Sequence, residues 1–184
     1  MATIVATPGA SNANSFLTEV EFIAYLATRG NVHSGATVTG TTCTEAEKVA
    51  MIDATRDLDL LSWRGSRVTA TQRLAIPRAY FPDPDPPDDA ASSLDDAIYF
   101  AEDEIPQRVK DACAELALQF LKAGTTDLAM PDGTDGVQRK KVDVLETEYF
   151  QHRATKGLAR YPRVQALIAP LLASGAGGLS VSRV

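Results

Sequence analysis

The helical spacing of apolar residues between Pro106 and Gly124 constrains the fold of this chain most strongly. The apolar positions there are Val109, Ala112, Cys113, Leu116, Ala117 and Phe120. This spacing is typical of an amphipathic helix with one buried face. Proline is favoured at the first helical position and glycine just beyond the last turn, so both ends are marked. The sequence therefore predicts a helix that begins at Pro106 and needs a partner surface for its apolar face.

Caps and apolar faces predict three more helices. Two capping boxes, in which a hydroxyl accepts from an early N–H and a glutamate reaches back, are Thr18 with Glu21 and Thr44 with Glu47. The helices that follow are expected to end near Gly30 and Leu61. Pro162 opens the last helix, and a further short helix is expected over 69–74, before Pro77.

The predicted fold is mainly α, a small bundle of about four helices with a short β-hairpin or extended arm and flexible termini. A length of 184 residues suits one domain with extensions. The expected parts of this single domain are a helical core at about 16–124 and 161–173, an arm or hairpin at about 125–160, and a C-terminal tail at 174–184. The arm is placed where Val142 and Val144 begin a partial alternation.

Composition argues against several classes of protein. No apolar run approaches the roughly 18–20 residues that span a membrane, and the N-terminus lacks the basic and apolar regions of a signal peptide. The two cysteines, Cys43 and Cys113, are too few for a disulfide scaffold. We expect synthesis in a reducing cytosol and no contact with a membrane.

No catalytic or metal-binding pattern is present. His33 and His152 lack a ligand-spaced partner, and HExxH, Walker A, GxSxG and CxxC motifs are absent. Four aspartates offer a possible cation loop, and they are Asp83, Asp85, Asp88 and Asp89. The glycine and distal glutamate of an EF-hand are missing, so a solvated acidic loop is the favoured interpretation. We predict no enzyme, no cofactor and no metal site.

Charge occurs in blocks that indicate interacting surfaces. Residues 60–82 hold no acid and four arginines, which are Arg64, Arg67, Arg73 and Arg78. Residues 83–104 hold nine acids and no Lys or Arg. The blocks are candidate interfaces, paired within one subunit or between neighbours, and the arginines are alternatively phosphate contacts. A shorter basic cluster is Arg139, Lys140 and Lys141, for which solvated surface is the default and a partner or DNA contact the alternative.

Trp63, the only tryptophan, has two interpretations. It can stack on a nucleic-acid base, or it can anchor the loop after the second helix against the core. A stacking platform usually holds several aromatic side chains. The structural interpretation is therefore favoured.

The segment that begins at Trp63 also resembles a known family. Its signature residues are Trp63, Gly65, Gln72, Leu74, Pro77 and Arg78, and it is accompanied in order by Asn14-Ser15-Phe16, Ile105-Pro106 and Tyr161-Pro162. Together they resemble the head–tail adaptor, or head completion, proteins of tailed phages. Relatives of that family are also labelled DnaT-like single-stranded-DNA-binding proteins. Two departures are Ile76, where an aromatic residue is frequent, and the long acidic insertion at 79–104.

The resemblance implies a structural virion protein, made in the host cytoplasm and placed at the head–tail interface. Copies of the chain are expected to form a ring, a dodecamer, between the portal protein and a tail or tail-completion protein. Genomic DNA would pass through the lumen, and part of 83–104 is expected to be exposed there or at a subunit junction. The DnaT-like label implies the alternative, a single-stranded-DNA-binding module. A sequence pI near 4.9 and 7% aromatic residues weigh against that alternative.

Overall fold

The fold is mainly α, as the sequence predicts. The computed structural model describes residues 2–29, 42–86, 98–124, 139–142, 145–148 and 157–173. Its helices are α1 (Glu19–Thr28), α2 (Glu45–Asp59), α3 (Gln107–Ala123) and α4 (Pro162–Ile168), with 3₁₀ turns η1 (Gly157–Arg160) and η2 (Ala169–Leu171). Its strands form two short antiparallel pairs, β1 (Ser66–Arg67) with β2 (Arg78–Ala79) and β3 (Arg139–Val142) with β4 (Leu145–Glu148).

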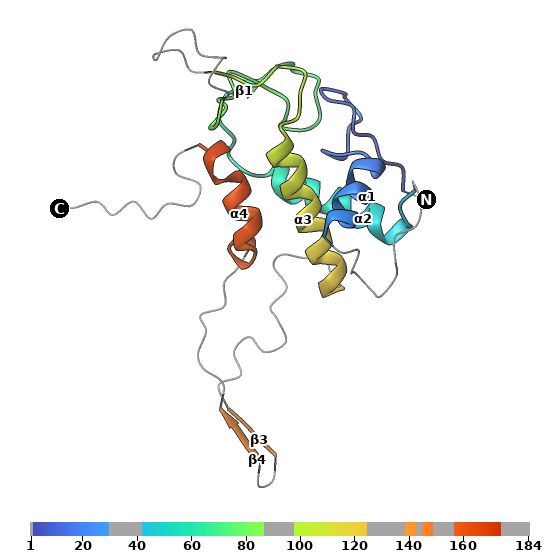
Figure 1. Ribbon diagram of the computed structural model, residues 1–184, viewed down its shortest axis with the longest axis vertical. Coiled ribbons are helices and arrows are strands. Elements are labelled where there is room, and N and C mark those ends of the chain that lie inside the picture. Colours follow the sequence, from blue (N-terminus) through green and yellow to red (C-terminus); the bar gives the residue numbers. More distant parts are fainter. Residues whose placement is uncertain are drawn as a thin grey trace, which may run out of the picture.

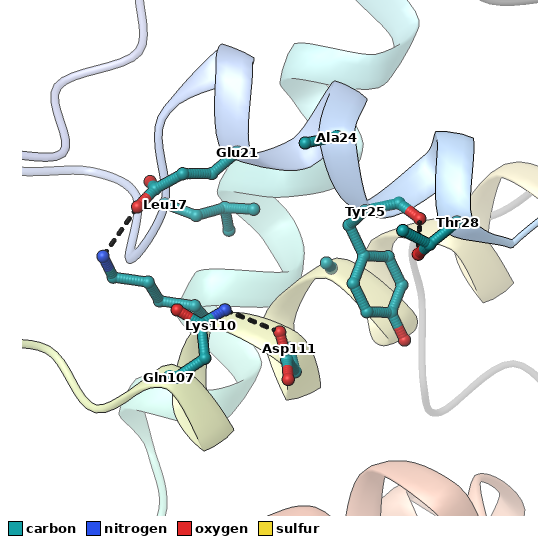
Figure 2. Close-up of a pocket in the computed structure, with 9 residues that line it drawn as sticks. Leu17, Glu21, Ala24, Tyr25, Thr28, Gln107, Lys110 and Asp111 are labelled. Carbon is teal, nitrogen blue, oxygen red and sulfur yellow. Dashed lines mark hydrogen bonds and ion pairs between the residues drawn. The ribbon is translucent and has the colours of Figure 1, made fainter.

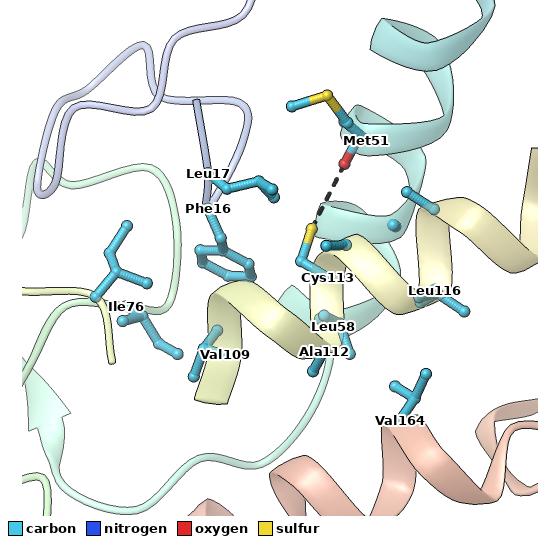
Figure 3. Close-up of a cluster of buried hydrophobic side chains, with 14 of the residues drawn as sticks. Phe16, Leu17, Met51, Leu58, Ile76, Val109, Ala112, Cys113, Leu116 and Val164 are labelled. Carbon is cyan, nitrogen blue, oxygen red and sulfur yellow. Dashed lines mark hydrogen bonds between the residues drawn. The ribbon is translucent and has the colours of Figure 1, made fainter. Parts of the chain in front are cut away.

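Helix α3 is the centre of the described core. Helices α1 and α2 lie on one side of it and α4 on the other (Figure 1). Because it is covered from several directions, every residue from Ala112 to Leu118 is buried, a wider face than the apolar stripe alone predicts. Figure 3 shows Phe16, Met51 and Val164 converging on this helix from different segments.

The predicted helix ends are largely confirmed. Both capping boxes form, with Thr18 Oγ1 accepting from the Glu21 N–H at 3.3 Å and Glu21 Oε2 accepting from the Thr18 N–H at 2.7 Å. Gly124 ends α3 with a left-handed φ of 66°. Pro106 is the N-cap of α3 and not its first residue, a shift of one position.

The short helix expected over 69–74 is absent, and that prediction was wrong. The segment is a series of turns and bends between β1 and β2. The side chain of Gln72 bonds to the backbone N–H groups of Val68 and Thr69 at 3.0 Å each. A side chain that satisfies these donors removes the advantage of helical bonding.

The β3–β4 pair confirms a hairpin inside the predicted arm. Arg139 pairs with Glu148 and Val142 with Leu145. Figure 1 shows this hairpin well apart from the helices. The division of the domain into core, arm and tail stays a prediction. His33, Asp88, Asp89, His152 and the tail 174–184 lie outside the described residues.

Candidate nucleic-acid interface

Trp63 anchors the loop that carries the signature residues. It is 5% exposed, and its Nε1 donates a 3.0 Å hydrogen bond to the carbonyl oxygen of Leu58. The ring meets Phe81 edge to face, with centroids 6.3 Å apart. A ring covered on this scale has no free face for a nucleic-acid base.

Gln72 holds the interior of the same loop. It is 2% exposed, and besides its two acceptor bonds its Nε2 donates to the carbonyl oxygens of Leu74 and Pro77, both at 2.9 Å. The buried amide thus satisfies four backbone groups that no strand or helix pairs. Leu74 and Pro77 are themselves buried.

Gly65 allows the two sides of the loop to approach closely. Its φ is +70°, and a Cβ at this position would lie 2.4 Å from the carbonyl oxygen of Ala79. Both the backbone conformation and the space require glycine. The contact brings the Trp63-Arg64-Gly65 turn against β2.

Arg78 fixes that turn from the β2 side. Its guanidinium donates to three carbonyl oxygens, those of Arg64 at 2.6 Å, Gly65 at 2.7 Å and Ala75 at 3.2 Å. Burial, followed by the neighbouring charge of Arg67, lowers the pKa of Arg78 below its usual value. Arg78 is therefore a half-buried cation whose guanidinium donates to backbone carbonyl oxygens.

The η2 turn, which follows α4, closes the other side of the arginine turn. The N–H of Arg64 donates to the Leu171 carbonyl oxygen at 3.1 Å, and its Nε donates to the Leu172 carbonyl oxygen at 3.0 Å. The Ala173 N–H donates to the Ser62 carbonyl oxygen at 2.8 Å. The arginine turn and the η2 turn are one bonded unit.

Positive charge at this surface is not balanced locally. Arg64, Arg67 and Arg73 are exposed, and no carboxylate of the described residues forms an ion pair with them or with Arg78. The acidic block does not supply a partner within its described part. Asp85 lies 3.5 Å from Arg108 instead, measured from Oδ2 to NH2.

Two exposed tyrosines lie beyond the arginine segment in the sequence, with the backbone of Tyr80 against that of Gly65, and sequence reasoning missed them. Tyr80 follows β2 and is 71% exposed, while Tyr99 is 49% exposed. Their ring centroids are 5.9 Å apart at an interplanar angle of 88°. We call Arg64, Arg67, Tyr80 and Tyr99 the arginine–tyrosine surface.

Backbone pairing brings the segments that carry the two tyrosines together. Pro82 bridges to Tyr99, and the Phe100 N–H donates to the Phe81 carbonyl oxygen at 2.9 Å. Phe81 and Phe100 pack toward the core with centroids 5.7 Å apart. Tyr80 itself lies in the turn after β2 with a left-handed φ of 54°, so the alternation of extended chain does not apply to it. The signal in the sequence was the Tyr-Phe dipeptide repeated at 80–81 and 99–100.

A groove elsewhere on the described surface is bordered by polar side chains that pair with each other. This groove, of about 380 Å³ between α1 and α3, is bordered by Glu21 and Lys110, whose Oε1 and Nζ are 2.6 Å apart (Figure 2). Gln107 and Asp111 on the same groove bond to each other at 2.8 Å. Among the described residues, no three or more His, Cys, Asp or Glu side chains gather closely enough to hold a metal ion. No described helix has the length and hydropathy needed to cross a membrane.

One buried charge cluster joins three helices. Glu115 on α3 accepts from the Tyr25 hydroxyl at 2.7 Å and from Arg29 NH2 at 2.9 Å, both on Oε2, while Gln119 Nε2 donates to Oε1 at 2.9 Å. Arg163 on α4 lies 3.8 Å from Oε2. These contacts lock α1 and α4 onto α3.

Comparison with protein families identifies the chain's relatives. A family model described as "Putative DnaT-like ssDNA binding protein" matches residues 1–184. This chain belongs to that DnaT-like family. Searches of curated proteins and of solved structures found no match. The family description agrees with the alternative that the sequence resemblance offered, and the arginine–tyrosine surface is the feature of this DnaT-like chain on which it can be tested.

Proposed function

We propose that this chain binds single-stranded DNA through the arginine–tyrosine surface. The observation that carries the proposal is the exposed Tyr80–Tyr99 pair, together with arginines that have no described carboxylate partner. Family membership supports the same class of ligand.

The chemistry of this surface suits a single strand. Proteins that bind single strands combine cations along the backbone with aromatic rings on which bases stack. Arg67 offers an exposed guanidinium, and Arg64 keeps N–H groups beyond the one bonded to Leu172. Tyr80 offers a ring to an unstacked base, which a paired duplex does not present.

The test is fluorescence anisotropy of a labelled oligo(dT) titrated with protein at several salt concentrations. Tyr80→Ala is expected to weaken binding about 5- to 150-fold, because stacking contributes roughly 1–3 kcal/mol per base. Tyr80→Phe keeps the ring and is expected to bind like the wild type. Arg67→Ala is expected to reduce the slope of log K against log salt by ~0.7.

A matched control removes a charge elsewhere. Arg56 on α2 is exposed and already pairs with Asp53 at 2.8 Å. Arg56→Ala is expected to leave affinity and salt slope unchanged. Equal losses in Arg56→Ala and Arg67→Ala, or tighter binding to duplex than to single strand, would refute the proposed surface.

We propose a head–tail adaptor as the second function, on the basis of the sequence resemblance. Two observations favour it. Acidic residues of the described part of 83–104 are exposed, as a DNA-repelling lumen requires, and they include Asp85, Glu102, Asp103 and Glu104. The β3–β4 hairpin stands apart from the helices, as a docking arm would.

In this second function copies of the chain form a ring, expected to be a dodecamer, between portal and tail components of the virion. Light scattering of the protein alone and mixed with its candidate portal protein tests it. A complex of defined multiple stoichiometry supports the adaptor. A protein that ignores the portal and binds oligonucleotide supports the first function alone. Both proposed roles are non-catalytic.

A further inference from the structure

The β3–β4 hairpin has two free edges. Its two strands form four residue pairs, and the described part of the chain adds no third strand to either side. An isolated two-stranded hairpin is marginally stable in water, and more strands or a packed face are needed to stabilise it. Strand edges also present unpaired N–H and C=O groups that template further pairing.

No described helix packs against this hairpin. Its substantial contacts are between β3 and β4 themselves, and Figure 1 shows it at the far end of the molecule from the arginine–tyrosine surface. Within the described residues, no third strand and no packed helix supplies the additional stabilisation, and both strand edges are open to further pairing.

The two edges carry opposite charge. β3 reads Arg-Lys-Lys-Val, with three cations, and β4 reads Leu-Glu-Thr-Glu, with two acids. Within the hairpin, Arg139 is paired with Glu148 and Lys141 with Glu146. Opposite charges directly across a strand pair stabilise it, and like charges destabilise it.

We propose that a second copy of this chain extends the hairpin, with β4 of one copy pairing antiparallel to β3 of the next. This arrangement repeats between molecules the strand register that sets cationic residues opposite acidic ones within each hairpin. Pairing β3 with β3 would oppose cations to cations, and pairing β4 with β4 would bring acids together. Charge thus selects a head-to-tail contact between two different edges over a two-fold symmetric one.

The first experiment uses a charge-exchanged hairpin. The variant R139E/K141E/E146K/E148K keeps complementary pairs within its own hairpin and between its own copies. It is mismatched with the wild type at the β4–β3 contact. Analytical ultracentrifugation at low salt and high protein concentration is expected to show self-association of each protein alone, weakening as salt rises.

A mixture of the wild type and the charge-exchanged variant tests the β4–β3 contact directly. Fluorescence energy transfer between labelled wild-type and exchanged chains is expected to be several-fold lower than between copies of the same protein. Equal transfer in the mixture, or a wild type that stays monomeric at low salt, would overturn the proposal. A third outcome would also overturn the proposal. The exchanged variant would lose oligonucleotide affinity, yet associate equally well with itself and with the wild type. The hairpin would then be a DNA contact.

Disulfide trapping tests the register. Residues opposite each other in antiparallel strands have Cα atoms about 4.5–5.5 Å apart, within the span of a disulfide. A mixture of Arg139→Cys and Glu148→Cys chains is expected to form a cross-linked dimer between the two variants. Homodimers of Arg139→Cys formed as readily as mixed dimers would contradict the head-to-tail contact. Tyr80→Ala serves as the control, since it is expected to leave association unchanged whether or not the chain binds DNA.

Discussion

Arg64 donates a hydrogen bond from its Nε to the carbonyl oxygen of Leu172, 108 positions later in the chain and 3.0 Å away. The backbone N–H of Arg64 bonds to the preceding carbonyl, that of Leu171, at 3.1 Å. Two consecutive carbonyls at the end of η2 therefore fix the turn at which the arginine–tyrosine surface begins. Changes that loosen α4 are expected to alter that surface as well.

Gly65→Ala is expected to destabilise the protein much more than Gly9→Ala. Both glycines have positive φ, +70° and +72°, so both variants carry a left-handed cost of about 1–2 kcal/mol. Only at Gly65 does the new Cβ meet backbone, the Ala79 carbonyl oxygen at 2.4 Å, whereas nothing lies within 4 Å at Gly9. The extra loss at Gly65 is expected to be about 2 kcal/mol or more. Urea denaturation measures both, and equal losses would contradict the close contact.

The free energy of unfolding is expected to fall as pH drops below about 4.5, in part through Glu115. Burial raises the pKa of Glu115, but hydrogen bonds from Tyr25 and Gln119 and the charge of Arg29 outweigh it and leave the pKa below 4.5. A carboxyl with a lowered folded-state pKa stabilises fully above its unfolded value and loses that contribution as pH falls through the folded one.

Glu115→Gln tests this dependence. Urea denaturation at a series of pH values is expected to show a flatter acid limb than in the wild type. The free energy of unfolding at neutral pH is expected to drop by about 1 kcal/mol or more, because the hydrogen bonds from Tyr25 and Arg29 lose a charged acceptor. Glu102→Gln is the control, since Glu102 is exposed. An unchanged acid limb in Glu115→Gln would exclude Glu115 as a source of the dependence.

Trp63 fluorescence is expected to be insensitive to DNA. Because Trp63 is the only tryptophan and is 5% exposed, its emission reports the core alone. Emission is expected to be blue-shifted, poorly quenched by acrylamide and unchanged on addition of oligonucleotide. If a Tyr80→Ala variant binds oligonucleotide normally and its Trp63 emission is quenched on binding, then Trp63 and not Tyr80 stacks on the DNA.

Neither cysteine is expected to react with a thiol reagent in the native protein at pH 8. Burial raises the pKa of Cys113 to about 12 and, with the charges of Glu47 and Glu19, that of Cys43 to about 12. The reactive thiolate is therefore scarce at that pH. Both thiols are expected to titrate in urea. Fast reaction of one thiol without urea would show that its segment opens locally.

Local signals made the helices predictable. The Thr18 and Thr44 boxes act over three residues, and Gly124 ends α3 by its own left-handed conformation. Such interactions depend on sequence neighbours, so a pattern shows them. The width of the α3 face was not predictable in the same way, because Glu115 is buried only through partners brought in from α1 and α4.

The candidate site was harder to predict because it depends on distant pairing. Tyr80 and Tyr99 meet only when the chain around Pro82 pairs with the chain around Tyr99, across the acidic insertion. Gln72 replaces a predicted helix by bonding to backbone on both sides of itself. Neither interaction produces a periodic pattern in the sequence. Residues 63–78 contain one aromatic residue, Trp63, so the sequence of that segment did not predict a stacking site that includes Tyr80 and Tyr99.

The bonds from Arg64 to Leu171 and Leu172 also set a time order for synthesis. Arg64 leaves the ribosome 108 residues before Leu172, whose carbonyl oxygen helps to fix its turn. Domains fold as units while the chain emerges from its N-terminus. A nascent chain therefore cannot hold the arginine–tyrosine surface in its final form until the η2 turn has been made and has docked against Arg64.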